Sequence, residues 1–165
     1  PAARTRGVGK RHRGRIAEAL VDEGRKTILD IGIGSGSVSF DFLTNTEGGG
    51  GLGYESNKAR AEQVRKEACQ LKLRLEVRSE PFRQLPAGGT WDCIFVGNTS
   101  AMDVCTASEA MSRLNAGGVL AFSHWDDGTV RPLTQYFQKN HTDRTTIARW
   151  EYDDRPRFLV VVSKP

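Results

Sequence analysis

The segment TILDIGIGSGSVSF, residues 27–40, says more about the fold than any other part of this chain. Its first residues, Ile28 to Ile31, are apolar apart from Asp30 and predict a short buried strand. Three glycines follow at alternate positions: Gly32, Gly34 and Gly36. Glycine adopts conformations closed to other residues and lets a ligand approach the main chain. The apolar residues after the glycines predict a helix, whose first N–H groups are free to bind a ligand. The segment therefore predicts a ligand-binding turn.

The spacing of the glycines distinguishes two classes of nucleotide ligand. A dinucleotide fingerprint, G-x-G-x-x-G, requires its third glycine at position 37, which is occupied by Ser37. The observed pattern, D-x-G-x-G-x-G from Asp30, resembles motif I of the class I methyltransferases that use S-adenosylmethionine. An ordinary glycine turn of an α/β domain is the alternative, because a lone glycine motif has low specificity.

An acidic residue ends the next predicted strand, Leu52 to Glu55, and lies 23 residues after Gly32. In nucleotide-binding α/β domains a carboxylate at this place accepts hydrogen bonds from the ribose hydroxyls. Glu55 is therefore predicted to bind a ribose, and a surface glutamate at a strand end is the alternative. Ser56, the next residue, is assigned to the same cofactor site.

The rest of the chain predicts alternating helices and strands. Apolar periodicity indicates helices over 10–21, 59–71, 102–114 and 130–137, and strands over 73–77, 91–96, 119–122, 145–150 and 158–162. This order predicts an α/β, Rossmann-like class I methyltransferase fold. It has a mostly parallel seven-stranded sheet, helices on both faces and a C-terminal antiparallel hairpin.

Composition fits a single domain over residues 1–165 with a basic N-terminal arm over about residues 1–15. No apolar run approaches the roughly 18–20 residues of a membrane span. The net charge is +4, and six basic residues fall in the arm: Arg4, Arg6, Lys10, Arg11, Arg13 and Arg15. Such a cluster favours an anionic partner, either a small polycarboxylate or nucleic acid, and a solvated arm is the alternative.

Cysteine and histidine usage argues against a disulfide framework and against a metal centre. The three cysteines are Cys69, Cys93 and Cys105, without C-x-x-C spacing. They indicate reduced thiols, and residues 1–15 lack the apolar core of a secretory signal, so a cytoplasmic protein is expected. No two of the three histidines have metal-ligand spacing, and no metal is expected: His12, His124 and His141.

Further site residues are expected at the carboxyl ends of the later strands. Class I methyltransferases commonly carry an acidic residue after the third strand, near the adenine, and Glu80 is in that place. Phe82 is predicted to lie against the adenine ring or in the core. Gly97, after the fourth strand, is assigned to the cofactor site. Asn98 and His124 are predicted to orient the substrate or handle a proton, and a structural role is the alternative for His124.

A narrower resemblance covers nearly the whole chain. It rests on Lys10-Arg11 before a helix, Leu29-Asp30-Ile31-Gly32-x-Gly34-Ser35-Gly36-Ser37-Val38-Ser39, Ile94-Phe95-Val96-Gly97, Leu114-x-x-Gly117-Gly118-x-Leu120 and Val162-x-Lys164-Pro165. These segments are similar to the decarboxylating precorrin methyltransferases of cobalamin biosynthesis, which are free-standing or the C-terminal part of a fused enzyme. The resemblance implies methylation of carbon-15 of a late precorrin with loss of carbon dioxide from an acetate side chain. Lys10 and Arg11 would bind the carboxylates of this tetrapyrrole.

The chain departs from the family pattern at three places around the expected pocket. Asn98-Thr99-Ser100 follows Gly97 where the family has a further glycine-rich turn. Ser79-Glu80 replaces a Gly-Asp pair, and the linker at residues 48–51 is short. The acceptor is therefore less well specified than the cofactor.

Two other functions stay open from the sequence. Residues 94–98 also resemble histone-lysine methyltransferases of the Dot1 type, so a basic protein or RNA is an alternative acceptor. A non-catalytic binding module with the same fold is the second alternative, although a scaffold has no need of Asp30, the glycines and Glu55. Methyl transfer from a sulfonium depends on positioning and desolvation, so neither a nucleophile nor a metal is required. A homo-oligomer is also left open.

Overall fold

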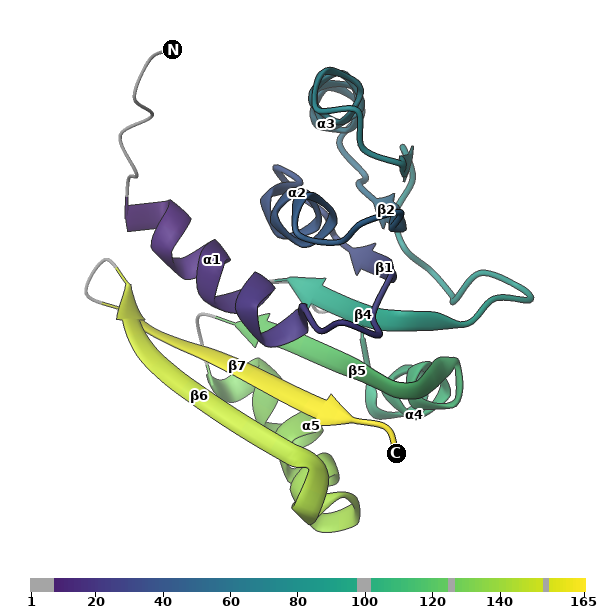
Figure 1. Ribbon diagram of the computed structural model, residues 1–165. Coiled ribbons are helices and arrows are strands. Elements are labelled where there is room, and N and C mark those ends of the chain that lie inside the picture. The colour runs from purple at the N-terminus through teal and green to yellow at the C-terminus, as the bar shows by residue number, and fades with distance from the viewer. Residues whose placement is uncertain (1–7, 98–101, 125–126, 153–154) are drawn as a thin grey trace.

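The computed structural model describes residues 8–97, 102–124, 127–152 and 155–165, and for residues 8–13, 124, 127–130, 152 and 155 it describes the backbone alone (Figure 1). Its helices are α1 (Val8–Leu20), α2 (Ser37–Thr44), α3 (Lys58–Gln70), α4 (Val104–Ser112), α5 (Asp127–Asn140) and the 3-10 turn η1 (Thr142–Arg144). Its strands are β1 (Thr27–Ile31), β2 (Gly50–Tyr54), β3 (Leu75–Arg78), β4 (Trp91–Gly97), β5 (Leu114–His124), β6 (Thr145–Tyr152) and β7 (Arg155–Ser163).

The seven strands form one sheet in the order β3-β2-β1-β4-β5-β7-β6. The pairs β2–β3, β1–β2, β1–β4 and β4–β5 are parallel. Strand β7 lies between β5 and β6 and is antiparallel to both. The predicted mostly parallel sheet with a C-terminal hairpin is thus confirmed. From β1 the chain adds strands on one side of the sheet, and from β4 it adds them on the other. The point between β1 and β4 where this direction reverses is the usual ligand crevice of an open α/β sheet.

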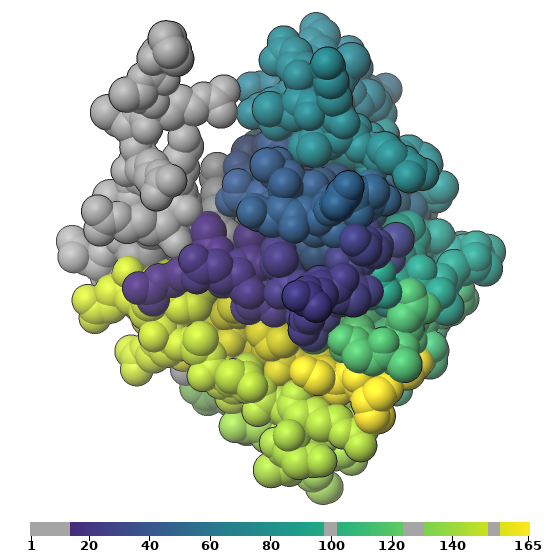
Figure 2. All heavy atoms as spheres, viewed as in Figure 1, coloured from purple at the N-terminus to yellow at the C-terminus, as the bar shows by residue number. Residues whose placement is uncertain are grey.

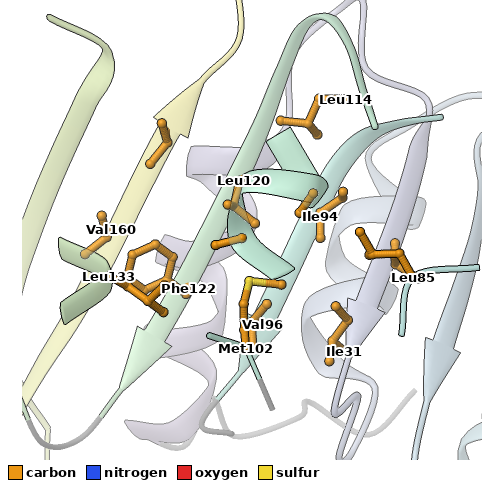
Figure 3. Close-up of a cluster of buried hydrophobic side chains, with 14 of the residues drawn as sticks. Ile31, Leu85, Ile94, Val96, Met102, Leu114, Leu120, Phe122, Leu133 and Val160 are labelled. Atoms are coloured by element: carbon orange, nitrogen blue, oxygen red, sulfur yellow. The ribbon is translucent and has the colours of Figure 1, made fainter. Parts of the chain in front are cut away.

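Helices cover both faces of the sheet, as predicted, because successive strand residues point to opposite faces. Leu29 and Ile31 belong to a cluster with buried side chains of α4 and α5, part of which is drawn in Figure 3. Ile28 points the other way and packs with buried side chains of α1 and α2. Figure 2 shows α1 on the surface between α2 and the hairpin β6–β7, where Arg15 lies over the ring of Trp150 at 5.9 Å.

One connection between two strands contains no helix, and none is predicted there from the sequence. Residues 79–90, between β3 and β4, form neither a helix nor a strand. The segment contains two prolines and two adjacent glycines, all unfavourable in a helix: Pro81, Pro86, Gly88 and Gly89. Leu85, which is 5% exposed, covers this part of the sheet in place of a helix by joining the cluster around Ile31 (Figure 3).

Element boundaries differ from the predictions where tertiary pairing decides them. α4 ends at Ser112, because Leu114 pairs with Trp91 as the first residue of β5. Strand β2 begins at Gly50, within the expected linker at residues 48–51. A Cβ atom on Gly51 would lie 2.9 Å from Ile28 Cγ2, and one on Gly53 would lie 2.5 Å from Ile33 Cδ1. These glycines therefore serve close packing inside a strand.

The amino edge of the sheet, where β1, β4 and β5 begin, is joined by hydrogen bonds to Asp92. Its Oδ2 accepts from the N–H groups of Lys26 and Thr27 at 2.7 and 2.9 Å, and from the Thr27 hydroxyl at 3.0 Å. Its Oδ1 accepts from Asn115 Nδ2 at 2.8 Å. Lys164 Nζ also donates to the Leu114 carbonyl at 2.6 Å, which ties the C-terminal segment to the same edge. Within the described ranges no helix combines the length and apolarity needed to cross a bilayer.

Candidate cofactor and substrate site

The glycine turn between β1 and α2 has the left-handed backbone that its sequence predicts. The φ angles of Gly32, Gly34 and Gly36 are 73°, 58° and 76°. The Ile33 N–H donates to the Tyr54 carbonyl at 2.9 Å and so fixes the turn against β2. A Cβ on Gly36 would lie 2.7 Å from Phe40 Cζ, whereas one on Gly34 would meet nothing nearer than the Gly32 carbonyl at 3.9 Å. The missing side chain at Gly34 thus leaves open space above the turn, as a bound ligand requires.

Helix α2 begins at the end of this turn. Its N-cap residue is Gly36, which has no side chain to accept hydrogen bonds from the first N–H groups of the helix. The positive end of the helix and these N–H groups form a site for a carboxylate or another anion.

Asp30 lies beneath the turn and is only 1% exposed. Its Oδ2 accepts a hydrogen bond of 2.6 Å from the Ser39 hydroxyl, on the first turn of α2. Its Oδ1 is buried without a hydrogen-bond partner among the described residues. Burial raises the pKa of Asp30 from 3.8 to about 7, although the bond from Ser39 acts in the opposite direction. A buried acceptor without a partner is the feature expected where a ligand supplies the missing donor.

Glu55 follows β2 directly and is 7% exposed. Its Oε1 accepts from the Asn57 N–H at 2.9 Å, and its Oε2 lies 3.5 Å from Arg60 Nη1. A carboxylate has about four acceptor positions. Two of these positions are therefore left for further donors.

The sheet register brings the predicted residues to one edge. Ile31 pairs with Tyr54 on one side and with Val96 on the other, and Tyr54 pairs with Arg78. The residues that follow these strand positions therefore lie side by side at the carboxyl edge: Gly32, Gly97, Glu55 and Ser79. Ser56 and Glu80 are exposed there. Phe82 is partly buried on the core, with its ring edge-on to that of Tyr54 at 5.4 Å between centroids.

The predicted substrate residues are placed less completely. Asn98 lies outside the described residues. His124 is the last residue of β5 and pairs with Phe158. Lys10 and Arg11 belong to the beginning of α1, which lies at the end of the sheet to which β1, β4 and β5 point (Figure 1). The roles assigned to these four residues stay predictions.

Four residues at this edge were not assigned a role from the sequence. Ser39 is the partner of Asp30, and its one signal is a serine among apolar residues on the buried side of α2. Asn57 and Arg60 contact Glu55, and Asn57 has the sequence signal of a helix N-cap. Ser123, 4% exposed, pairs with Gly97 and has an unpartnered hydroxyl in the described part of the chain. Nothing in the sequence marks it.

The strand order, the glycine turn at the end of β1 and the carboxylate after β2 together define a class I methyltransferase fold. The sequence model of the precorrin methyltransferase domain matches residues 10–127. The chain therefore belongs to the precorrin methyltransferase domain family. Among proteins with curated annotation, none is recognisably similar in sequence.

Solved structures agree on the fold. A precorrin-6y C5,15-methyltransferase from Geobacter metallireducens superposes with a TM-score of 0.76 at 17% identity, over 100% of this chain and 94% of that one. The C-terminal domain of a precorrin-6Y C5,15-methyltransferase from Rhodobacter capsulatus gives 0.73 at 17%, over 94% and 89%. An rRNA methylase from Streptococcus thermophilus gives 0.68 at 14%, over 93% and 95%. At such identities these likenesses concern the fold alone.

Family membership confirms the predicted enzyme class. The protein is an S-adenosylmethionine-dependent methyltransferase of the precorrin methylase type, with S-adenosylmethionine as its methyl donor. The non-catalytic module considered from the sequence is therefore set aside. The open space at Gly34, the unpartnered oxygen of Asp30 and the spare acceptor positions of Glu55 fit this cofactor.

Proposed function

We propose that the protein methylates carbon-15 of a late precorrin and that carbon dioxide is lost from an acetate side chain of this substrate. The observation that carries the proposal is the family match over residues 10–127, which includes Lys10 and Arg11, the glycine turn and Glu55. The family resemblance of the sequence supplies the site of methylation. A role in cobalamin biosynthesis belongs to the same proposal.

The cofactor residues have separate tasks in this proposal. The N–H groups at the start of α2 bind the amino-acid carboxylate of S-adenosylmethionine. Asp30 Oδ1 accepts a hydrogen bond from a donor at the same end of the cofactor. Glu55 binds the ribose hydroxyls, with Ser56 beside it. Glu80 and Phe82 border the adenine. When bound, S-adenosylmethionine supplies a methyl group that is already activated by its sulfonium.

The substrate residues act by binding and orientation. A late precorrin carries many carboxylates, and the positive charges of Lys10 and Arg11 complement them. Gly97 borders the reacting methyl group, and Asn98 and His124 orient the macrocycle or accept a proton. Positioning and exclusion of water supply the rate enhancement, because the methyl carbon needs no further activation.

The test is a transfer assay with competing acceptors. The protein is incubated with S-adenosylmethionine and, separately, an enzymatically prepared late precorrin, an rRNA fragment and a histone. Mass spectrometry of the precorrin should show one added methyl group together with the loss of carbon dioxide. Glu55→Gln should lower the rate mainly through the KM for S-adenosylmethionine. Transfer to RNA or histone, with none to the precorrin, would overturn the proposed acceptor and leave the enzyme class intact.

A further inference from the structure

Glu55, Asn57 and Arg60 form a closed ring of hydrogen bonds between the end of β2 and the first turn of α3. The Asn57 N–H donates to Glu55 Oε1 at 2.9 Å. The Asn57 side-chain oxygen accepts from the Arg60 N–H at 3.0 Å. Arg60 Nη1 then reaches back to Glu55 Oε2 at 3.5 Å. Each member of the ring is thus held by the other two.

Helix capping explains how an arginine three residues past the N-cap comes to face Glu55. Asn57 is the N-cap of α3, with extended backbone (φ −79°, ψ 111°) and its side chain bonded to the Arg60 N–H. This bond fixes the first turn of the helix and therefore the origin of the Arg60 side chain. Capping of the helix accounts for the bond between Asn57 and the Arg60 N–H. It does not account for the contact between the Arg60 guanidinium and Glu55, which leaves the cap unchanged.

We propose that Arg60 is a positioning residue of the ribose subsite, which holds the Glu55 carboxylate in the orientation that receives both ribose hydroxyls. This inference rests on the proposed cofactor role of Glu55. The ring occupies one acceptor position on each carboxylate oxygen, so that one position on each oxygen is left for the ribose. Without Arg60, Glu55 Oε2 loses its partner and the carboxylate is free to rotate about its last torsion.

Burial makes the guanidinium effective. The side chain of Glu55 is 7% exposed, whereas that of Arg60 is 55% exposed. The carboxylate has lost most of its hydration, and the arginine compensates the charge from the solvent side. The pair is thereby screened less than an ion pair with two exposed partners.

The experiment compares Arg60→Gln, Arg60→Lys and the control Lys66→Gln by calorimetric titration with S-adenosylhomocysteine. Lys66 is exposed on the same helix, and its replacement removes the same charge. Arg60→Gln should weaken binding about threefold to tenfold, as expected for one ion pair with a buried member. Arg60→Lys should recover part of the loss, and Lys66→Gln should match wild type. In the transfer assay Arg60→Gln should raise KM and leave kcat unchanged.

A ligand without ribose hydroxyls separates positioning from a general structural effect. The probe pair is 5′-methylthioadenosine and its 2′,3′-dideoxy form. Arg60→Gln should weaken the binding of only the ligand with hydroxyls, and its urea midpoint should lie only slightly below that of wild type, so that the variant is folded in the assay. Equal losses for both ligands, or no loss for either, would overturn the inference. Failure of wild type to bind S-adenosylhomocysteine would overturn the proposed cofactor role of Glu55, and this inference with it.

Discussion

The polar groups at the amino and carboxyl edges of the sheet differ in whether their hydrogen bonds are satisfied. At the amino edge Asp92 accepts four hydrogen bonds, and Arg25 Nε donates to the Gly117 carbonyl at 3.1 Å. At the carboxyl edge three buried oxygens lack partners among the described residues: Asp30 Oδ1, Ser79 Oγ and Ser123 Oγ. Unsatisfied buried groups cost stability, and natural folds keep few of them. The amino edge therefore stabilises the fold, whereas the carboxyl edge, where the cofactor is proposed to bind, leaves buried oxygen atoms without partners among the described residues.

The largest effect is expected at the amino edge from Asp92→Ala. The substitution leaves the N–H groups of Lys26 and Thr27 and the amide of Asn115 without their acceptor. The free energy of unfolding in urea should fall by about 2–4 kcal/mol. Below its unfolding transition, the variant should bind S-adenosylhomocysteine as wild type does. A large loss of ligand affinity in the folded variant would contradict the division between the edges.

Asp92 also predicts a dependence of stability on pH. Burial acts to raise its pKa, but hydrogen bonds from Asn115, Lys26 and Thr27 outweigh it and leave the pKa below the ordinary value of 3.8. A carboxyl group with a lowered folded pKa stabilises the fold above its unfolded pKa. This stabilisation should disappear in acid, as the pH falls through the folded pKa, and Asp92→Ala should lack this part of the acid sensitivity.

Asp30→Asn should separate stability from binding at the carboxyl edge. The folded pKa of Asp30, about 7, exceeds the ordinary value of 3.8, so between these values the folded protein holds a proton that the unfolded chain has released. Stability without cofactor should therefore fall as the pH rises over this interval. The variant should exceed wild type by about 1–3 kcal/mol near pH 8 and match it near pH 4. Its affinity for S-adenosylhomocysteine should fall about tenfold. A variant both less stable and equally good at binding would contradict this account.

Substitution of two glycines with similar, positive φ angles, one at each edge, compares the edges directly. Gly34 (φ 58°) lies in the carboxyl-edge turn and Gly117 (φ 75°) in the first part of β5, and a Cβ on either meets no atom closer than 3.9 Å. Alanine at either position should cost about 1–2 kcal/mol of stability through its left-handed backbone. Gly34→Ala should in addition weaken S-adenosylhomocysteine binding more than tenfold, because its methyl group enters the ligand space. Equal affinities for the two variants would contradict the placement of the cofactor above Gly34.

The smallest effects are expected from hydroxyl groups at the two edges. The Thr27 hydroxyl donates to Asp92 and accepts from the Asp92 N–H at 2.9 Å, whereas the Ser123 hydroxyl has no partner in the described residues. Thr27→Val should cost about 1–2 kcal/mol, whereas Ser123→Ala removes an unpartnered hydroxyl and should raise stability slightly, by up to about 0.5 kcal/mol. Urea unfolding measures both. A loss of stability for Ser123→Ala would mean that its hydroxyl is bonded in solution.

The sequence was sufficient wherever one short segment carries its own signal. The glycine spacing predicted the turn, and the alternating order of strands and helices predicted a mostly parallel sheet with helices on both faces. The distance from Gly32 to Glu55 placed the carboxylate next to the turn, because β1 and β2 are parallel neighbours. Patterns of this kind determine local structure without contacts from distant residues, so the sequence alone is enough to interpret them.

The remainder depended on contacts between distant residues. The amide of Asn115 meets Asp92 across the β4–β5 pair, and the start of β5 at Leu114 follows from its pairing with Trp91. The burial of Leu85, from the segment that joins β3 to β4, also depends on such contacts. The contact of Arg60 with Glu55 follows from helix geometry, but a charged residue at the start of a surface helix carries no sequence signal for it.

Calorimetric titration of S-adenosylhomocysteine into wild type, Glu55→Gln and the exposed-site control Glu62→Gln tests the central claim most directly. Wild type and Glu62→Gln should bind with equal, micromolar affinity. Glu55→Gln should bind about tenfold or more weakly, because a charged acceptor of two hydroxyl groups is lost. Equal affinity for all three proteins would contradict the ribose site at the end of β2, and no binding to any of them would contradict the cofactor site at the carboxyl edge.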